Sequence, residues 1–456
     1  MRITAQLINA TAVALGRLLG FQQPADAALS AFFREHRALG SHDRAFIAET
    51  AYAVLRRRRT LEKLLGAETN PRRLTLAALV KFGGISQRQL EDALGEQERK
   101  WVAALKGRIK GQIKDQIKDP QLEALTLAEQ ADFPDWLTER LLADRDADAL
   151  LELARGLNQP APLDLRVNPL KAGRDAVLAR LAEEGLAAEA GRLSPLAIRL
   201  KEKPALQKHP LYLDGTLEVQ DEGSQLLGFL LAPRRGEMVA DFCAGAGGKT
   251  LLLGALMRST GRLYAFDVSD KRLARLRERV ARAGLSNVHP VTIAGENDNR
   301  VKRLAAKLDR VLVDAPCSGL GTLRRNPDLK WRQTPASVAE LARKQQNILA
   351  GAARLVKPGG RLVYATCSVL TEENDDVVAA FLAAHPDFRQ ISAQEILHRQ
   401  GIALACGESL RLTPHAHGTD GFFAVALEKN STNNPERNPE HNPEHNPERN
   451  HAEVKS

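Results

Sequence analysis

Hydrophobic residues change their spacing along this chain, and each change predicts a different kind of element. Up to about residue 150 they recur every three or four positions, as at residues 45–55 and 74–80, and alternating runs are absent. That spacing is typical of amphipathic helices. We therefore expect residues 1–150 to form an all-α domain.

A shorter region of mixed pattern follows. After NQPAP at residues 158–162, which is typical of a joint between domains, residues 163–168 and 196–200 alternate as strands. Residues 172–185 between them form a helical pattern that ends in glycine. We expect residues 158–218 to be a small α/β connecting subdomain.

From about residue 219 short hydrophobic runs alternate with helical segments. This alternation predicts a parallel sheet with helices on both faces, and hence an α/β fold. A late run at residues 421–427 predicts a strand that completes the sheet. Residues 430–456 carry a repeated NPER or NPEH unit without hydrophobic partners, which predicts a disordered tail. The strands predicted before the last one are residues 238–242, 263–267, 291–293, 310–314 and 361–366.

Composition and charge narrow the kind of partner. The chain has 456 residues, of which 43% are hydrophobic and 27% charged, and this suits a globular protein of two or three domains. The net charge is +9, and residues 31–110 hold 17 Lys and Arg against 9 Asp and Glu. That excess fits an anionic partner held by the helical region. The run from Arg56 to Arg59 could contact phosphates or could end a solvated helix.

Nothing in the chain predicts secretion, a membrane span or a metal site. The N-terminus lacks a long apolar segment with a cleavage site, and no window approaches the length of a membrane helix. We therefore expect a cytoplasmic protein, with a monomer as the default. The cysteines lack the paired short spacing of zinc ligands, so we expect reduced thiols and no metal. They are Cys243, Cys317, Cys367 and Cys406.

Two of these cysteines directly follow predicted strands. Cys317 lies in VLVDAPCSGLG at residues 311–321, and Cys367 lies in RLVYATCS at residues 361–368. The carboxyl ends of strands in an open α/β sheet form the crevice where ligands bind, so both thiols are placed for chemistry. The alternative is that both are small buried hydrophobic residues, as free cysteines usually are.

A glycine-rich turn, CAGAGGKT at residues 243–250, follows the first strand of this sheet. Glycine lets the backbone come close to a ligand, and the turn could serve NAD, ATP or S-adenosylmethionine. Its spacing differs from the phosphate-binding GxxxxGK[ST] loop and from the dinucleotide GxGxxG loop. Asp267 ends the next strand, where it could accept hydrogen bonds from the ribose hydroxyls of an adenosine or could simply be a turn residue.

Several motifs together resemble a known family, the RNA cytosine-5 methyltransferases of the RsmB/Sun (Fmu)/Nop2 group, over about residues 160–428. Residues 25–49 are also similar to the NusB-like RNA-binding domain of bacterial small-subunit rRNA enzymes. The resemblance implies a Rossmann-like class I methyltransferase sheet at residues 219–429, behind an all-α NusB-like domain and a small α/β subdomain. The motifs that carry it, in order, are VQDEGSQL at 219–226, DFCAGAGGKT at 241–250, DAPCSGLGT at 314–322, RRNPDLKW at 324–331 and ATCS at 365–368.

The resemblance also implies an activity: methylation of C5 of a cytosine in small-subunit (16S) rRNA through a covalent cysteine–C6 adduct. Because C5 of cytosine is a poor nucleophile, a thiolate adds to C6 and raises the electron density at C5. By similarity Cys367 is that nucleophile, and Cys317 assists proton removal from C5 and enzyme release. Asp314 would hydrogen-bond the flipped base, and Lys249 would contact the base or the cofactor carboxylate.

The same carry-over assigns the S-adenosylmethionine site, with two departures from the family pattern. The family's loop reads C-A-A-P-G-G-K, and this chain has Gly245 and Ala246 in place of its second alanine and its proline. We expect this change to weaken cofactor binding modestly. An aspartate that usually faces the adenine is missing, and we expect Glu296 in its place. The implied cofactor residues are Cys243, Ala244, Gly245, Ala246, Gly247, Gly248, Lys249, Asp267, Glu296 and Asp314.

Two other functions remain open: a tRNA cytosine-5 methyltransferase with the same chemistry, and a non-catalytic RNA-binding assembly factor that has kept the fold. A DNA cytosine methyltransferase is disfavoured, because that class uses the cysteine of a Pro-Cys motif and has no counterpart of Cys367.

Overall fold

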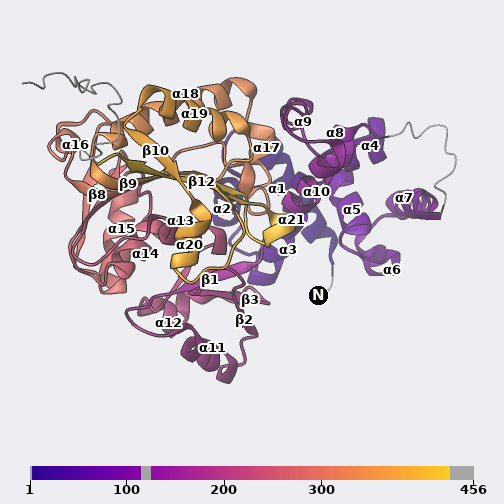
Figure 1. The fold of residues 1–456 in the computed structure, drawn as a ribbon. Helices are drawn as coiled ribbons and strands as arrows, with labels where there is room; N and C mark the ends of the chain where they lie inside the picture. The colour runs from indigo at the N-terminus through magenta and orange to yellow at the C-terminus, as the bar shows by residue number, and fades with distance from the viewer. Residues whose placement is uncertain (1–2, 115–124, 432–456) are drawn as a thin grey trace, which may run out of the picture.

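The computed structural model describes residues 3–114 and 125–431 (Figure 1). Its first part is helical, as the hydrophobic spacing predicts, and among its described residues no strand forms. Short 3-10 turns connect some of the helices. The helices are α1 Ala5–Leu18, α2 Ala25–Glu35, α3 Ser41–Arg56, α4 Arg58–Leu65, α5 Pro71–Lys81, α6 Gln87–Leu90, α7 Glu96–Lys114, α8 Leu127–Ala131, α9 Asp135–Leu142 and α10 Ala147–Leu157.

A four-stranded antiparallel sheet in the order β2-β3-β1-β4 comes next. The two predicted strands correspond to β1 and β3, while β2 and β4 are only three residues long and show no alternation in the sequence. Two helices accompany this sheet. The elements are β1 Leu163–Val167, α11 Arg174–Glu183, β2 Ala188–Ala190, β3 Ala197–Leu200, α12 Pro210–Leu213 and β4 Leu217–Val219.

The large sheet has eight strands in the order β10-β12-β9-β8-β5-β6-β7, with β11 paired to β12. The strands β9, β8, β5, β6 and β7 run parallel, and β12 pairs antiparallel with β9 and with β10 beyond it. The predicted α/β fold is confirmed. The strands are β5 Met238–Asp241, β6 Arg262–Asp267, β7 Val288–Thr292, β8 Leu308–Asp314, β9 Val356–Thr366, β10 Phe388–Ile391, β11 Ser409–Leu412 and β12 Phe422–Lys429.

The chain reverses its direction across this sheet at one point. It builds β5, β6 and β7 outwards and then returns to add β8 and β9 on the other side of β5. The carboxyl ends of β5 and β8 therefore flank a topological switch point, where open α/β sheets bind ligands. The helices of this part are α13 Glu222–Leu231, α14 Gly248–Leu256, α15 Asp270–Ala283, α16 Asn299–Lys302, α17 Leu329–Arg332, α18 Pro335–Ala353, α19 Asp375–Ala384, α20 Ala393–Arg399 and α21 Pro414–His417.

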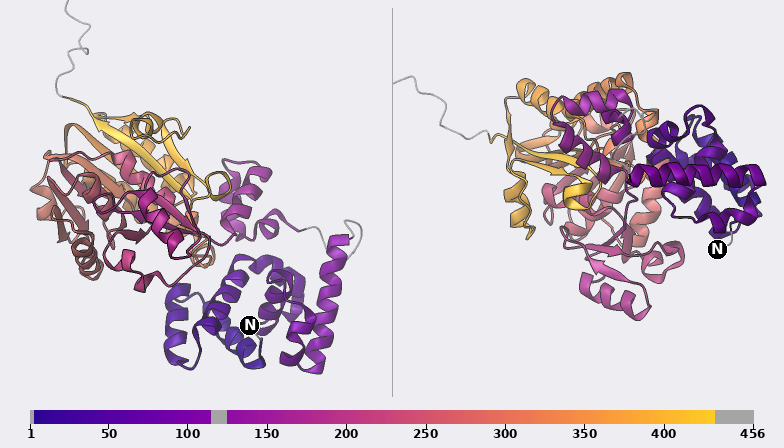
Figure 2. Two further views of the ribbon diagram at one scale, coloured as in Figure 1. Left: turned by 90° about the horizontal axis from the view of Figure 1, so that it is seen from below. Right: turned by 90° about the vertical axis from the view of Figure 1, so that its right-hand side faces the viewer.

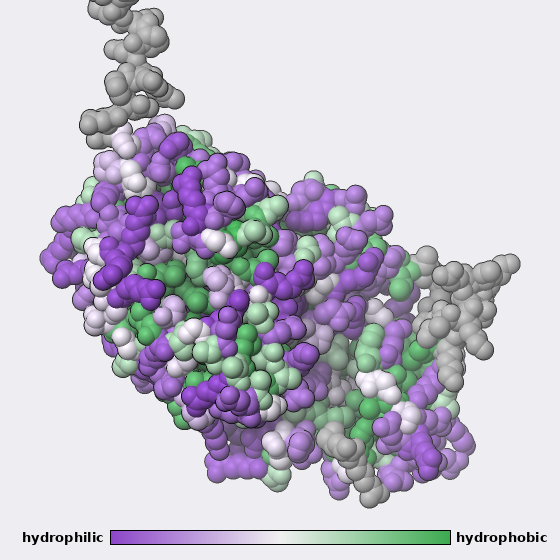
Figure 3. Space-filling view, turned by 60° about the horizontal axis from the view of Figure 1, so that its bottom comes forward, coloured by the Kyte–Doolittle hydropathy of each residue, from purple (hydrophilic) through white to green (hydrophobic). Residues whose placement is uncertain are grey.

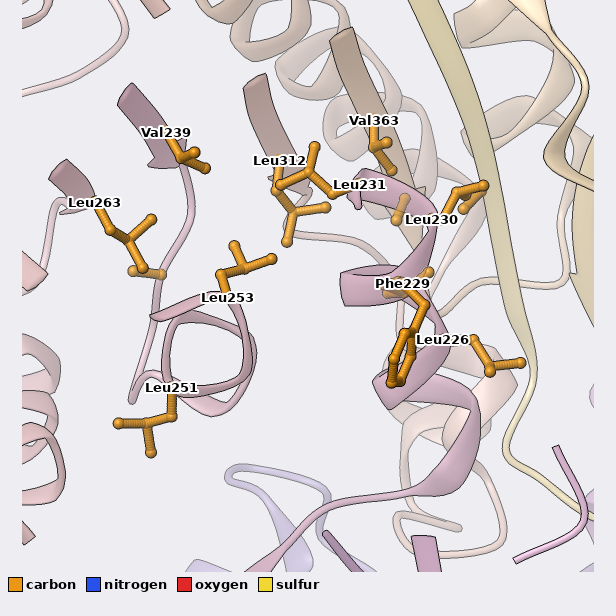
Figure 4. Close-up of a cluster of buried hydrophobic side chains, with 14 of the residues drawn as sticks. Leu226, Phe229, Leu230, Leu231, Val239, Leu251, Leu253, Leu263, Leu312 and Val363 are labelled. Atoms are coloured by element: carbon orange, nitrogen blue, oxygen red, sulfur yellow. The ribbon is translucent and has the colours of Figure 1, made fainter. Parts of the chain in front are cut away.

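Helix α13 is the most deeply buried helix against this sheet, because every one of its ten residues is buried. Its side chains Leu230 and Leu231 lie beside Leu312 of β8 and Val363 of β9 (Figure 4). Burial of each such side chain is worth roughly 1.5–3 kcal/mol. This packing holds β8 and β9 in place from one face, and both strands end in the predicted cysteine loops.

Helices α8 to α10 pack against those cysteine loops and not only against the helical region. Leu320 and Leu323 from the loop after β8, and Val369 and Leu370 from the loop after β9, share one hydrophobic cluster with residues of these helices. In Figure 2 these helices lie between the N-terminal helices and the large sheet. The sheet edge that carries the two cysteine loops is therefore backed by helical residues from the first third of the chain.

The segment RRNPDLKW at residues 324–331 joins the N-terminal helices to the sheet. The Trp331 indole donates to the carbonyl of Leu55 (2.8 Å), and the Lys330 ammonium donates to the carbonyl of Arg56 (2.9 Å). Arg56 in turn donates to the carbonyl of Arg324 (2.9 Å). This motif therefore connects the N-terminal helices to the large sheet through hydrogen bonds.

The arginine run from Arg56 to Arg59, which could contact phosphates or end a solvated helix, makes contacts within the protein. Arg57 lies 3.6 Å from the buried Asp132 carboxylate, Arg58 pairs with Glu62 (2.6 Å), and Arg59 pairs with Asp135 (2.6 Å). Arg56 is committed to Arg324, as described above. All four arginines make contacts within the protein and stay partly exposed, so they are more than a solvated helix end, and a contact with phosphates stays a prediction.

Burial of Lys330 makes stability depend on pH. Lys330 is fully buried, and this burial lowers its pKa to about 7. Between pH 7 and the ordinary lysine value of about 10.4 the unfolded chain binds more protons, so wild-type stability rises with pH. We expect the Tm of wild type to rise relative to that of Lys330→Met between pH 6.5 and 9. The free energy of unfolding of wild type should rise relative to that of the variant by roughly 2 kcal/mol over this range. Calorimetry at both pH values checks this, with exposed Lys208→Met as the control; a Tm difference that does not change with pH would contradict it.

Two other expectations concern the periphery of the molecule. The predicted tail falls almost wholly on residues 432–456, outside the described residues. Within residues 3–114 and 125–431, no helix combines the length and the hydrophobicity needed to cross a bilayer. Nor do three or more His, Cys, Asp or Glu side chains of the described chain converge as metal ligands.

Candidate active site

The loops after β8 and β9 bring the two predicted cysteines into contact. The sulfur atoms of Cys317 and Cys367 lie 3.3 Å apart, and the backbone N–H of Cys367 points to the Cys317 sulfur (3.4 Å). The hydrogen bond with Cys367, together with burial and the nearby Glu373 carboxylate, raises the pKa of Cys317 well above its usual range. Cys317 is therefore held as a neutral thiol, which makes it a poor nucleophile.

Glycine allows the two cysteine loops to approach this closely. The N–H of Gly321 donates to the carbonyl of Cys367 (2.8 Å), and the N–H of Gly421 donates to the carbonyl of Gly321 (2.8 Å). A Cβ atom at Gly321 would lie 2.3 Å from the Gly421 oxygen and 2.8 Å from the Cys367 oxygen. Any side chain at residue 321 would push the two loops apart.

A buried polar network fixes the loops from behind. The carboxylate of Glu373 accepts from the backbone N–H of Ser318 (2.8 Å), the Ser318 hydroxyl (2.5 Å) and the Gln345 amide (2.9 Å). The same amide also donates to the carbonyl of Pro316 (3.0 Å), and the Tyr364 hydroxyl donates to the carbonyl of Glu373 (2.6 Å). The network joins both sides of Cys317 to the segment that follows Cys367.

Lys249 and Asp314 form an ion pair beside the cysteines. The Lys249 ammonium lies 2.6 Å from the Asp314 carboxylate, and the Lys249 side chain is 14% exposed. Burial alone would lower the pKa of Lys249, but the charge and hydrogen bond of Asp314, with a further contribution from Cys367, raise it above its usual value. Lys249 is therefore a stable cation, and it shares one electrostatic environment with Asp314 and Cys367.

The glycine-rich turn has the geometry of a nucleoside site. Gly245 and Gly247 have φ of 55° and 89°, and a Cβ atom at Gly247 would lie 2.0 Å from a methyl carbon of Leu276. The carboxylate of Asp267 accepts from the N–H groups of Gly245 (2.9 Å) and Ser269 (2.7 Å), which fixes its orientation. Beside Gly245 the space is open, since a Cβ atom there would meet nothing within 4 Å.

Asp241, just before this turn, is a residue whose importance the sequence analysis missed. One carboxylate oxygen accepts from the Thr250 hydroxyl (2.7 Å), while the other is buried without a hydrogen-bond partner. Burial raises the pKa of Asp241 to about 6. Its neighbour Cys243 is partly buried and packs against the hydrophobic core, and burial and the nearby carboxylates raise the pKa of this thiol far above its usual range. A contact between Cys243 and the cofactor stays a prediction.

Glu296 makes its contacts away from the turn. Its side chain packs against Gly351 of α18, where a Cβ atom would lie 2.6 Å from the Glu296 Cβ, and its carboxylate accepts from the Asn297 amide (3.3 Å). The neighbouring Asp298 caps α16 by accepting from the N–H of Arg300 (2.8 Å). A contact between Glu296 and an adenine stays a prediction.

Comparison with known proteins identifies the family. A protein of Synechocystis sp., named a probable ribosomal RNA small subunit methyltransferase B, is 34% identical over 425 residues, which are 89% of this chain and 95% of that protein. The chain belongs to the RsmB/RsmF family of 16S rRNA methyltransferases. The resemblance stated on the motifs is confirmed.

The match to this family extends over both sheets. The family model for 16S rRNA methyltransferase RsmB/F matches residues 228–428, and that for the ferredoxin-like domain of the RsmF/B methyltransferases matches residues 133–207. A Bacillus subtilis relative, named a probable ribosomal RNA small subunit methyltransferase B, is 36% identical over 308 residues, covering 66% of this chain and 68% of that protein. A methyltransferase homolog protein from Pyrococcus horikoshii has a TM-score of 0.57 at 28% identity, covering 66% of this chain and 97% of that chain.

The cofactor of this RsmB/RsmF member is S-adenosylmethionine, as predicted. The residues of the turn fit it. The open space at Gly245 and the oriented carboxylate of Asp267 suit a ribose.

Proposed function

We propose that this protein methylates C5 of a cytosine in small-subunit rRNA through a covalent adduct with Cys367. The single observation that carries the proposal is the 3.3 Å contact between two thiols at the ends of adjacent parallel strands. One thiol is needed to add to the base and a second polar group to hold the water that takes the proton, and the contact puts Cys317 beside Cys367 for that role.

In this reaction Cys367 adds as a thiolate to C6 of the cytosine, which makes C5 electron-rich. Bound S-adenosylmethionine supplies an activated methyl group to that carbon. Cys317 holds a water that takes the proton from C5 and passes it to solvent, and the bond between Cys367 and C6 then breaks. Cytosine leaves with one methyl group in place of one proton, and the Cys367 thiolate is restored.

The Lys249–Asp314 pair supplies the means to recognise cytosine. The Watson–Crick edge of cytosine presents an amino donor beside the N3 acceptor. The Asp314 carboxylate would accept from the amino group, and Lys249, which keeps donors free besides the one directed at Asp314, would donate to N3. Positive charge near N3 also stabilises the electron density that thiolate addition pushes into the ring.

The rRNA substrate is supported by the names of the relatives and by the surface of the protein. The relatives in Synechocystis and Bacillus subtilis are named ribosomal RNA small subunit methyltransferases. On the face in Figure 3 hydrophilic residues cover most of the area, and hydrophobic residues form smaller scattered groups. Together with the net charge of +9, this suits a polyanionic partner. We assign RNA binding to the N-terminal helices and the small sheet, in a monomeric enzyme.

The test is transfer of labelled methyl from S-adenosylmethionine to small-subunit rRNA that lacks the modification. We expect wild type to produce 5-methylcytosine, identified by mass spectrometry of the digested RNA. We expect Cys317→Ala to accumulate a protein–RNA adduct that survives denaturing electrophoresis, because adduct formation no longer leads efficiently to release. The double variant Cys317→Ala/Cys367→Ala is the matched control and should form none.

Other results would change the assignment. Transfer to tRNA but not to rRNA would keep the chemistry and overturn the substrate. Methylation of rRNA at another base or another atom of cytosine would overturn the adduct mechanism. RNA binding without transfer to either RNA would favour an assembly factor.

A further inference from the structure

An arginine-lined pocket of about 320 Å³ lies at the edge of the large sheet opposite the cysteines. Arg310 and Arg361, paired in register on β8 and β9, form part of it. Asp314 ends β8 four residues beyond Arg310, which is about 13 Å along the strand. Arg234 and Arg399 complete the set of charged residues, and no acidic side chain is among the described residues that line the pocket.

The two inner arginines are held rigidly. Arg310 forms a two-pronged pair with Glu237 (2.7 and 3.2 Å) and donates to the carbonyl of Leu231 (2.8 Å). Arg361 donates to the carbonyls of Leu230 (3.2 Å) and Leu231 (3.3 Å) at the end of α13. These contacts fix both guanidinium groups before any ligand binds, and such preorganisation lowers the cost of binding.

The positive charge of the pocket is only partly offset. Glu237 pairs with Arg310 and the exposed Glu395 pairs with Arg399 (3.0 Å), whereas the partners of Arg361 are carbonyl groups. The Nε atom of Arg361 is buried without a hydrogen-bond partner. Burial and repulsion from Arg310 and Arg234, partly offset by the Glu428 and Glu237 carboxylates, lower the pKa of Arg361 to about 10. A bound anion would relieve the repulsion between these arginines.

We propose that Arg234, Arg310, Arg361 and Arg399 form a phosphate-binding site, and that it holds a backbone phosphate of the RNA substrate. Guanidinium groups match phosphate oxygens with paired donors, and a pocket of this size admits a phosphate with its sugar. Arg234 and Arg399 are exposed, so the site is open to a long polyanion. The inference rests on the proposed function in taking RNA as the source of the phosphate; a free phosphate compound would offer the same chemistry.

The test compares RNA affinity of the full-length protein with and without the two outer arginines. Arg234→Gln/Arg399→Gln leaves the structural contacts of Arg310 and Arg361 intact, so we expect it to fold. Its Kd for a small-subunit rRNA fragment should rise about tenfold at low salt, and the slope of log K against log salt should fall by about one. Arg235→Gln, on the same loop but outside the pocket, is the matched control and should behave as wild type.

A second measurement separates the sources of phosphate. Calorimetric titration of inorganic phosphate into wild type and the double variant tests the site without RNA. Phosphate binding lost in the variant with unchanged RNA affinity would assign the site to a free phosphate compound and overturn the RNA contact. No change in either measurement would overturn the site itself. Methyl transfer by wild type to the same RNA tests the proposed function separately. If wild type transferred no methyl group, the comparison of RNA affinities would still test the phosphate site.

Discussion

Replacing Cys367 with alanine is expected to lower the single-turnover rate of methyl transfer to rRNA by about 10⁴-fold or more. Alanine offers no electron pair to add to C6, so C5 stays unreactive however well the base and cofactor are bound. Cys317 cannot take over, because burial and the Glu373 carboxylate, both of which persist in the variant, still raise the pKa of its thiol. Rapid mixing of enzyme–cofactor complex with limiting rRNA, followed by counting of labelled methyl, measures the rate.

Two controls make this result specific. Equilibrium dialysis of S-adenosylmethionine should give the wild-type Kd for Cys367→Ala, because the cofactor turn follows β5 and the substitution follows β9. Cys406→Ala, which removes a partly exposed thiol from the loop before β11, should keep the wild-type rate. Undiminished transfer by Cys367→Ala would exclude Cys367 as the nucleophile.

The buried strands were the most predictable part of the fold, since each is a hydrophobic run ended by small residues. The strands β5 and β6 match the prediction within one residue, whereas β9 begins at Val356, five residues before the predicted start. The early part of β9 contains Gly359 with φ of 73°, and its pairing with β8 shifts register there. Proline and glycine in KPGG are typical of a turn, so the sequence pattern alone could not show that this segment pairs.

Short antiparallel edge strands escaped prediction for a different reason. The strands β10 and β11 have four residues each, and both pair with β12. Four residues give only two alternations of hydrophobic and polar positions, which flanking helices obscure. Their positions depend on contacts with a strand that comes later in the chain.

The site residues that lie in motifs at the ends of strands could be predicted from the sequence. The residues that hold those motifs in place from other parts of the chain could not. Cys317, Cys367, Asp314 and Lys249 gather because parallel strands present their carboxyl ends at one edge. Glu373 carries no motif, since an acidic residue six positions after Cys367 has the pattern of an exposed helix start. Its role arises from a tertiary contact with Ser318, 55 positions away in the chain.

The charge pattern of the helical region was equally ambiguous. The arginine run indicates an anionic partner by composition, but the structure engages it with Asp132, Glu62, Asp135 and the backbone. Pairing of this kind depends on which acidic residues the fold brings near. Net charge therefore predicts the class of partner better than it predicts the surface that binds it.

Removal of the Glu373 carboxylate should have the second large effect, because it supports both cysteine loops at once. Glu373→Ala would leave the N–H and hydroxyl of Ser318 without this acceptor, and would open a cavity in a site where Glu373 is fully buried. We expect the free energy of unfolding to fall by about 3–5 kcal/mol. Thermal unfolding measured by calorimetry checks this, with the exposed Glu340→Ala on α18 as the control.

The same substitution should also displace Cys317, and this makes Glu373 a positioning residue as well as a stabilising one. Well below the Tm of the variant, we expect Glu373→Ala to lower kcat by about 10²-fold or more with little change in KM for rRNA, because a shift of about 1 Å in a reacting group is enough for such a loss. Glu373→Gln should recover most of the rate. Its carbonyl oxygen can accept from the Ser318 N–H and Gln345, and its amide can donate to the Ser318 hydroxyl, which then donates to Ser368. If folded Glu373→Ala kept the wild-type kcat, the network would serve stability alone.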